Sequence, residues 1–277
     1  LVVFSAAIAP ENPERQEAAR LGIPEMERST LLGELMMGHK NVICVCGAHG
    51  KTTTSSMIAE TLLECGMDPT VHIGGRLDAL GGGSRIGGKD VFVAEACEFH
   101  GSFLEMHPTV AVVLNIDADH LDYYQDIDHI QVAFGQFLSL VPPSGTALGW
   151  GEDARIQALF ETLNCETRTF GMNETNDYYP AHLTYNDTGC PRYDVVFRGE
   201  KLCRVELKVA GSFNVINSLA AFAAAHVAGA PAGEIAASLS RFAGVHRRFE
   251  FTGLIDQVKM YHDYGHNPAE MRAALSV

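Results

Sequence analysis

Residues 46–54, with the sequence Cys-Gly-Ala-His-Gly-Lys-Thr-Thr-Thr, constrain the fold more than any other stretch of the chain. The apolar, β-branched residues 41–45 before it predict a buried strand. The apolar spacing of residues 52–64 after it, ended by Gly66, predicts a helix. Glycines between a strand and a helix let the backbone wrap closely around a phosphate, whose charge then faces the N–H groups of the helix start. The order of strand, glycine loop, Lys-Thr and helix therefore predicts a phosphate-binding α/β domain.

The loop itself is open to two interpretations. Only Ala48 and His49 separate its two glycines, whereas a P-loop usually has four residues there. The alternative to a phosphate site is a tight strand-to-helix turn with a surface lysine. As a phosphate site, the loop offers Lys51 as a positive charge for the terminal phosphates and Thr52 as a hydroxyl ligand for Mg²⁺. The positions predicted to contact a nucleotide in this stretch are Gly47, Ala48, His49, Gly50, Lys51, Thr52 and Thr53.

The composition is that of a globular protein, long enough for one large domain or two to three smaller ones. Of the 277 residues, 47% are hydrophobic and 19% are charged, and the net charge is −14. This acidity argues against a nucleic-acid partner, which would require a basic surface. No apolar run approaches the roughly 20 residues of a membrane span. The seven cysteines are scattered without a C-x-x-C pair, which is typical of reduced thiols in the cytoplasm.

Three segments of unequal size are predicted. Residues 1–38 hold too little sequence to close a core and are interpreted as the tail of a preceding α/β unit. Residues 39–245 form the central domain with the glycine loop, and residues 246–277 begin a third unit. Because the chain starts at Leu1 without a basic segment, we predict no secretory signal and expect it to have been cut from a longer protein. The outer segments are expected to contain a strand at 1–7, a helix at 12–20 begun by Asn12-Pro13, a helix from Ser29 or Thr30 to Met37, a strand at 258–264 and a helix from residue 265.

The central domain alternates apolar strands with amphipathic helices, which predicts a parallel sheet with right-handed crossovers. Between residues 178 and 209 the pattern changes to that of hairpins. The predicted fold class is therefore α/β, with a P-loop-type, mostly parallel central sheet flanked by helices and a small antiparallel β insertion. The expected strands and helices are strands 41–45, 71–73, 90–94, 109–114, 146–150 and 167–171, with helices 52–64, 129–140, 153–163, 215–227 and 231–240.

Residues 74–88 include seven glycines together with Arg76 and Arg85. This density predicts a mobile loop. It is interpreted either as a solvated connector or as a lid that brings two positive charges to a substrate.

Polar side chains follow the predicted strands where they end. Glu95 comes directly after the strand at 90–94, and an Asn-Ile-Asp-Ala-Asp-His-Leu-Asp run at 115–122 follows the next one. Ligands of open parallel sheets lie beyond the carboxyl ends of the strands, so these groups are expected to meet the glycine loop. Mg²⁺ prefers hard oxygen ligands, which favours Thr52 and Glu95. His120 could bind a second ion or be a capping or core histidine, and the shortage of Cys and His argues against zinc.

Two further pairs are candidates for nucleotide contacts. Asn214 and Asn217 lie three residues apart at a helix start and so share one face. They could bind a nucleobase, or be an N-cap and a surface residue. Arg247-Arg248 could clamp a phosphate or flank a linker.

Taken in order, these motifs resemble the Mur ligase family. The residues that carry the resemblance are 47–54, Glu95 with Glu98, 115–122, Asn214 with Asn217, Arg247-Arg248-Phe249 and the Asp-Tyr-Gly-His of 263–266, with weaker matches at 5–8 and 12–14. The resemblance covers nearly the whole chain. It implies an ATP- and Mg²⁺-dependent cytoplasmic enzyme of peptidoglycan precursor synthesis that forms an amide bond through an acyl phosphate. It also implies that 1–38 is the end of a UDP-sugar-binding domain and 246–277 the start of a Rossmann-like ligase domain.

The resemblance also implies roles for single residues. Lys51, Glu95 and His120 would be catalytic. Thr52 and Glu95 would hold one Mg²⁺, and His120 would support a second. Asn214 and Asn217 would face adenine, while Arg248 and Asp263 would reach the nucleotide from the junction. Substrate contacts are expected from Arg85, Glu98 and Asn115.

Within the family, His49 and the 263–266 turn favour a member that joins L-alanine to UDP-N-acetylmuramate. Alternatives are a ligase that attaches a recycled tripeptide, a folate glutamate ligase or a non-catalytic nucleotide-binding module. A GTPase would need an Asn-Lys-x-Asp guanine motif, which the sequence lacks. The chain departs from the family at 97–100, Cys-Glu-Phe-His instead of Asp-Glu-Ser-Asp, and at 266–268, His-Asn-Pro instead of His-His-Pro. Because the resemblance places substrate-binding parts outside this sequence, we expect an ATPase core that is inactive alone.

Overall fold

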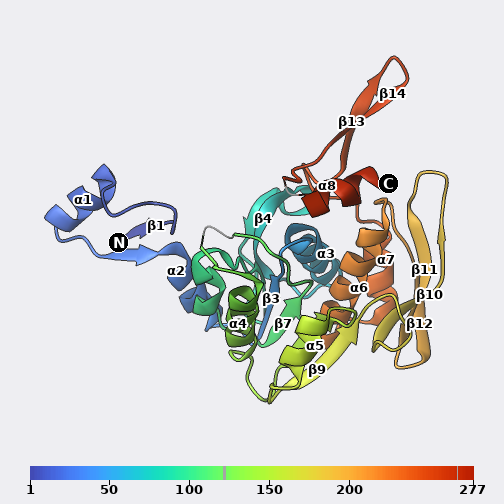
Figure 1. Ribbon diagram of the computed structural model, residues 1–277, viewed down its shortest axis with the longest axis horizontal. Coiled ribbons are helices and arrows are strands. Elements are labelled where there is room, and N and C mark those ends of the chain that lie inside the picture. The colour runs from blue at the N-terminus through green and yellow to red at the C-terminus, as the bar shows by residue number, and fades with distance from the viewer. Residues whose placement is uncertain (121–122, 267) are drawn as a thin grey trace.

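The computed structural model describes residues 1–120, 123–266 and 268–277 (Figure 1). Asp122, part of the predicted polar run, and Asn267, part of the predicted turn before the last helix, lie outside these ranges.

A ten-stranded sheet organises most of the chain, with strand order β12-β11-β10-β9-β8-β7-β3-β6-β4-β5. Its neighbours from β10 to β4 pair in parallel, and β5, β11 and β12 pair antiparallel. The predicted fold class is confirmed. The strands are β3 (Asn41–Cys46), β4 (Thr70–Leu77), β5 (Gly82–Arg85), β6 (Val91–Glu95), β7 (Val110–Val113), β8 (Thr146–Trp150), β9 (Glu166–Phe170), β10 (Tyr178–Tyr185), β11 (Pro191–Phe197) and β12 (Glu200–Glu206).

Helices cover both faces of this sheet, and their apolar sides form two cores. The helices are α1 (Pro13–Arg20), α2 (Arg28–Met36), α3 (Lys51–Glu64), α4 (Ile127–Leu138), α5 (Ala154–Phe160), α6 (Ser212–Val227), α7 (Ala232–Leu239) and α8 (Pro268–Leu275), with 3₁₀ segments η1 (Asp78–Leu80) and η2 (Phe99–Glu105). One core lies under α3, α6 and α7, and the other under α2, α4, α5 and η2. Among the described residues, no helix combines the length and apolar character needed to cross a membrane.

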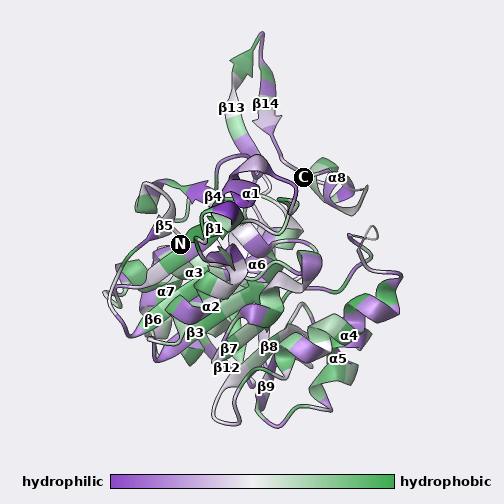
Figure 2. Ribbon diagram, turned by 90° about the vertical axis from the view of Figure 1, so that its left-hand side faces the viewer, coloured by the Kyte–Doolittle hydropathy of each residue, from purple (hydrophilic) through white to green (hydrophobic). Residues whose placement is uncertain are grey.

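The central strand β3 is buried on both faces, as its apolar sequence predicts. Ile43 and Val45 point into the first core, whereas Val42 and Cys44 point into the second. Figure 2 shows hydrophobic colouring over the central strands. Burial on both faces fixes the end of β3, and with it the glycine loop that follows.

The alanine-rich sequence of α6 has a packing reason. Its alanines from 220 to 225 are buried against α3 and the sheet, where small side chains let the helix approach closely.

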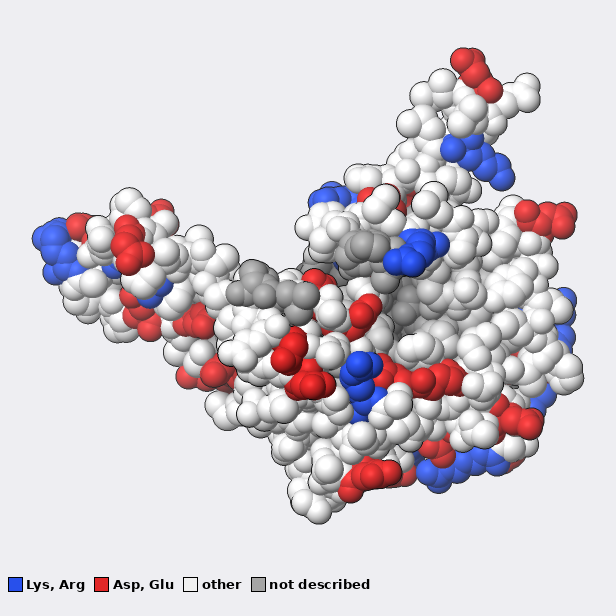
Figure 3. Space-filling view, viewed as in Figure 1, with Lys and Arg blue, Asp and Glu red and all other residues white. Residues whose placement is uncertain are grey.

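The face in Figure 3 carries acidic side chains at several places and basic ones in separate small groups, in keeping with the net charge of −14.

The predicted mobile loop at 74–88 is wrong. The segment forms the end of β4, the short η1 and the edge strand β5. Glycine is used here for close approach: a Cβ on Gly75 would lie 2.6 Å from Thr52 Cγ2, and one on Gly83 would lie 2.7 Å from the carbonyl oxygen of Gly75. A count of glycines could not distinguish close packing from flexibility.

The N-terminal segment forms a separate two-stranded parallel sheet of β1 (Val2–Phe4) and β2 (Glu25–Glu27), which projects from the main body in Figure 1. Asn12 caps α1 as predicted, since its side chain accepts a hydrogen bond from the Glu14 N–H. The predicted caps Ser29 and Thr30 are wrong. Helix α2 starts at Arg28 after Glu27, and Ser29 is buried in the first turn, where its hydroxyl donates to the Glu27 carboxylate.

The C-terminal segment forms a hairpin of β13 (Glu250–Ile255) and β14 (Val258–His262), followed by α8. The strand at 258–264 was predicted, but its partner was not. The turn uses Asp256 and Gln257, both at positive φ, in place of the Asn-Gly that usually marks such a turn.

The predicted antiparallel insertion is confirmed as β10–β12, which joins the main sheet through the pairing of Tyr178 with Phe170.

We predict that Gly83→Ala lowers the free energy of unfolding by about 1–3 kcal/mol, because the new methyl group would press on strand backbone. Gly82→Ala in the same strand is the control, since a Cβ there meets no atom within 4 Å. Urea unfolding measures both variants. Equal effects at the two positions would contradict the close-approach role of Gly83.

Candidate functional site

The glycine loop is pressed between the end of β7 and helix α6. Gly47 has φ 136° and Gly50 has φ 85°, values that favour glycine. A Cβ on Gly47 would lie 3.0 Å from Leu114 Cβ, and one on Gly50 would lie 2.5 Å from Asn217 Oδ1. The loop therefore holds one shape, with the start of α3 directly behind it.

Lys51 is not the surface lysine that the simple-turn interpretation assumed. Its side chain is 14% exposed and pairs with Glu98, which is 3% exposed. The ammonium donates to Glu98 Oε1 at 2.9 Å and to Gly47 O at 2.5 Å. Burial lowers the pKa of Lys51, but the charge and hydrogen bonds of Glu98 outweigh this and raise it above the ordinary value. Lys51 therefore remains a cation at the mouth of the loop.

Thr52 and Glu95 meet at the neighbouring strand ends, as the sequence predicted. The Thr52 hydroxyl donates to Glu95 Oε1 at 3.1 Å, and the Gly74 N–H donates to Glu95 Oε2 at 2.8 Å. Arg248 Nη2 donates to Thr52 Oγ1 at 3.3 Å. A Cβ on Gly74 would lie 2.8 Å from the Glu95 carboxylate, so the glycine-rich β4 is what lets Glu95 take this position.

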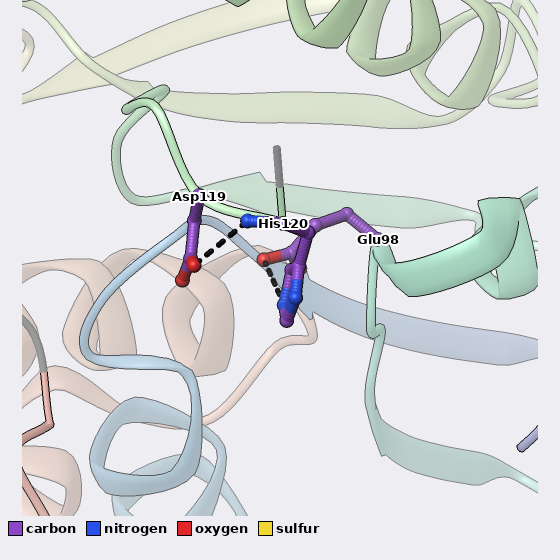
Figure 4. A group of neighbouring side chains, drawn as sticks. All are labelled: Glu98, Asp119 and His120. Atoms are coloured by element: carbon purple, nitrogen blue, oxygen red, sulfur yellow. Dashed lines mark hydrogen bonds and ion pairs between the residues drawn. The ribbon is translucent and has the colours of Figure 1, made fainter. Parts of the chain in front are cut away.

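A second group contains Glu98, Asp119 and His120 (Figure 4). Their potential ligand atoms lie within 4.8 Å of one another, and His120 Nε2 is 3.8 Å from Glu98 Oε1. His120 has φ 53°, and Asp119 Oδ1 accepts its backbone N–H at 2.8 Å. His120 thus lies in a different group from Thr52 and Glu95, together with Glu98 and Asp119, as its predicted assignment to a second ion requires.

His49 connects the loop to two other parts of the chain. Its backbone N–H donates to Asn115 Oδ1 at 2.9 Å, and Asn115 Nδ2 donates to its carbonyl at 3.0 Å. Its ring lies 3.5 Å from Glu270 of α8 and 3.2 Å from Asp117. Glu270 raises the pKa of His49, burial lowers it and Asp117 raises it, with a net increase. Burial would raise the pKa of Glu270, but His49 and the His266 N–H hold it at about 2.

A pocket of about 280 Å³ opens beside the loop. Most residues predicted to bind nucleotide line it: His49, Gly50, Thr52, Thr53, Asn214, Asn217, Arg248 and Asp263, together with Asn115. Gly47, Ala48 and Lys51 form the loop next to it. The apolar part of its wall consists of Leu114, Trp150, Val209, Phe213, Ile216, Phe242, Val245, Phe249, Ala273 and Ala274.

Asn214 and Asn217 are neither an N-cap nor surface residues. Gly211 caps α6, and both asparagines are buried. Asn217 Nδ2 donates to Asn214 Oδ1 at 3.2 Å, and Asn217 Oδ1 accepts from Thr54 at 3.3 Å. This pair supports the loop from the α6 side.

Asp263 and Arg85 occupy different surroundings. Asp263 lines the pocket and accepts the N–H groups of Phe249 at 2.7 Å and Gly265 at 2.6 Å, which ties the junction together. Arg85 lies on the edge strand β5, bound to Asp68 at 2.5 Å and to the Pro69 carbonyl at 2.7 Å. The structure therefore brings together Glu98, Asn115 and the loop, and leaves Arg85 apart.

Several pocket residues were missed by the sequence argument. Trp150 ends β8 in the same way that Glu95 ends β6, and the strand-end rule could have found it. Phe213 and Phe242 carry no such signal, because an apolar side chain in a pocket has the same sequence pattern as one in a core.

We predict that Glu98→Gln lowers the free energy of unfolding by about 3–5 kcal/mol, because it leaves the buried Lys51 cation without its counter-charge. Adding Lys51→Met should recover much of this loss in a double-mutant cycle measured by urea unfolding. Asp90→Asn, which breaks the exposed pair with Lys40, should change little and serves as the control. Simple additivity of the Lys51 and Glu98 variants would contradict the pair.

Comparisons with known proteins agree with this geometry. Residues 45–225 match the model of the Mur ligase middle domain. The chain is 44% identical over 276 residues to the UDP-N-acetylmuramate–L-alanine ligase of Acetivibrio thermocellus, covering 99% of the chain and 59% of that protein. It spans about three fifths of the length of the curated relatives it matches.

Two solved structures are similar across most of the chain. The UDP-N-acetylmuramate–alanine ligase of Thermotoga maritima has a TM-score of 0.86 at 27% identity, with 99% of this chain and 62% of that one covered. The UDP-N-acetylmuramate:L-alanyl-γ-D-glutamyl-meso-diaminopimelate ligase of Neisseria meningitidis has a TM-score of 0.77 at 28% identity, with 88% and 80% covered. The chain belongs to the Mur ligase family, and its residues 45–225 correspond to the family's middle domain.

Proposed function

We propose that this chain is the ATP-binding part of a cytoplasmic ligase that joins L-alanine to UDP-N-acetylmuramate in peptidoglycan precursor synthesis. One observation carries the proposal: Lys51, Thr52 and Glu95 meet at the carboxyl ends of adjacent parallel strands, beside a pocket of about 280 Å³. The similarity to ligases named for these two substrates supports the choice of reaction.

The reaction has two steps. A carboxylate oxygen of the sugar bonds to the γ-phosphorus of ATP while the bond to the bridging oxygen breaks, which gives an acyl phosphate and ADP. The amine of L-alanine then bonds to the acyl carbon, inorganic phosphate leaves and the amine loses a proton. The protein's task is to position these groups and neutralise phosphate charge.

Lys51 would supply that charge at the terminal phosphates. In this structure its N–H groups are directed to Glu98 and to carbonyls of the loop. Binding of a phosphate would therefore draw Lys51 partly away from Glu98. The start of α3 would face the same charge.

Mg²⁺ belongs to the proposal because the donor atoms present suit it. Thr52 and Glu95 offer hard oxygens 3.1 Å apart, and Glu98 and Asp119 offer two more beside the softer nitrogen of His120. We propose Thr52, Glu95 and His120 as ligands, in two groups, with Glu98 and Asp119 adding to the second. When bound, Mg²⁺ would neutralise the negative charge of the phosphates.

The remaining contacts follow from the lining of the pocket. Asn214, Asn217, Arg248 and Asp263 line it and are proposed to hold the nucleotide. Glu98 and Asn115, next to Lys51 and His49, are proposed to face the sugar substrate. Arg85, which lies on the edge strand β5 and pairs with Asp68, is proposed to reach a substrate from the sheet edge.

The domain boundaries are also proposed. Residues 1–38 would be the end of the UDP-sugar-binding domain, 39–245 the central ATP-binding domain, and 246–277 the start of the C-terminal ligase domain. Three separate sheets in these three segments support this division.

We predict that the chain binds ATP with Mg²⁺ and that Lys51→Ala weakens binding at least tenfold, because the buried cation at the loop is lost. Isothermal calorimetry measures both. Lys40→Ala is the control, since Lys40 is exposed and pairs with Asp90. Unchanged affinity in Lys51→Ala would contradict the phosphate role of the loop.

A second candidate is the ligase that attaches a recycled tripeptide, since the Neisseria structure bears such a name. In the enzyme that carries this chain, we predict that L-alanine stimulates phosphate release with UDP-N-acetylmuramate and that L-alanyl-γ-D-glutamyl-meso-diaminopimelate does not. A phosphate-release assay with each acceptor separates the two. Stimulation by the tripeptide alone would favour the second candidate, and ATP binding without stimulation by either would favour a non-catalytic module.

A further inference from the structure

We propose that Trp150, held in place by Glu152, is the wall of the pocket against which the nucleotide base packs. The proposal rests on the proposed ATP binding and adds to it a residue that strengthens binding of the base. Trp150 is the only tryptophan of the chain, and it lines the pocket together with Asn214 and Asn217.

The sheet places Trp150 at the right side of the glycine loop. β8 lies beside β7, which lies beside β3, so the end of β8 is two strands, or about 10 Å, from the loop that follows β3. Leu148 points into the core under α6, and side chains alternate along a strand, so Trp150 starts on the face of α6 and lines the pocket there. At the end of the strand, Trp150 also packs against the core on the other face. A nucleotide with its phosphates at the loop would therefore extend across β7 toward Trp150.

Glu152 fixes the indole ring of Trp150. Its carboxylate accepts the indole N–H, and it also accepts the backbone N–H of Asn173 at 2.9 Å, that of Met172 at 3.2 Å and Asn176 Nδ2 at 2.8 Å. A Cβ on Gly171 would lie 2.4 Å from Glu152 Oε2, so this close approach requires glycine. A carboxylate with four donors has little freedom to move, and neither does the indole bound to it.

The chemistry of the held ring favours a flat base. Because its N–H is committed to Glu152, Trp150 offers only an apolar π surface to the pocket. Leu114, Phe213 and Ile216 add further apolar surface. Aromatic surface binds bases by stacking without reading their hydrogen-bonding pattern, so the wall would strengthen binding of the base and leave the phosphate contacts unaffected.

The test uses the single tryptophan as its own probe. ATP should change the fluorescence of Trp150 with the same dissociation constant that calorimetry gives. Trp150→Ala should weaken ATP about tenfold and leave the affinity for inorganic tripolyphosphate, which has no base, unchanged. Trp150→Phe keeps an aromatic surface and should bind ATP within about threefold of the native chain.

Two further variants complete the experiment. Phe160→Ala is the matched control, because Phe160 is half-buried near the end of β8 on the opposite face. It should leave ATP affinity unchanged. Glu152→Gln turns an amide toward the N–H donors and should therefore shift the emission maximum of Trp150. It should weaken the binding of ATP but not that of tripolyphosphate. A general loss of structure would weaken the binding of both.

The outcomes separate this inference from the proposed function. Calorimetric ATP binding without a fluorescence change, and with full affinity in Trp150→Ala, would overturn the role of Trp150 and leave the proposed function standing. Equal losses for ATP and tripolyphosphate in Trp150→Ala would also overturn it. Absence of ATP binding to the native chain by calorimetry would overturn both.

Discussion

The buried ion pair of Lys51 and Glu98 is the interaction on which the rest of the site depends. Lys51 begins α3 after β3, and Glu98 follows β6, the strand beside β3. Their pairing joins two strand ends and keeps a charged amine below the surface, where it would otherwise be costly. Such an amine can bind a phosphate in place of the carboxylate, because its positive charge stays paired with a negative one. Thr52, Glu95, Asp119 and His120 are arranged around this pair.

The site is also connected to the C-terminal segment. His49, in the middle of the loop, lies 3.5 Å from Glu270 of α8, and Ala273 and Ala274 of the same helix line the pocket. Arg248 reaches Thr52 from the junction before the β13–β14 hairpin. A nucleotide in the pocket would therefore contact both the central sheet and the segment after residue 246. His49 therefore connects the glycine loop to α8 through Glu270.

The sequence predicted the parallel sheet and the meeting of polar groups at the carboxyl ends of its strands, since buried strands and strand-end polar groups leave clear patterns. The strand-end pattern placed Glu95 beside Thr52, and the spacing of Asn214 and Asn217 placed both on one helix face. The glycines of β4 and β5 were misinterpreted, because close packing and flexibility share the same residue type. The presence of Glu98 in the group of His120 depends on contacts between separate strand ends, and the role proposed for Trp150 depends on Glu152 from beyond its strand. Neither contact can be predicted from the spacing of residues along the sequence.

A crystal structure of this chain with a non-hydrolysable ATP analogue tests the central claim most directly. The account predicts that Lys51 Nζ moves from Glu98 to oxygens of the terminal phosphates, with the triphosphate along the loop and the base beyond β7. An analogue bound elsewhere, or bound in the pocket while Lys51 keeps both oxygens of Glu98 and contacts no phosphate, would contradict it.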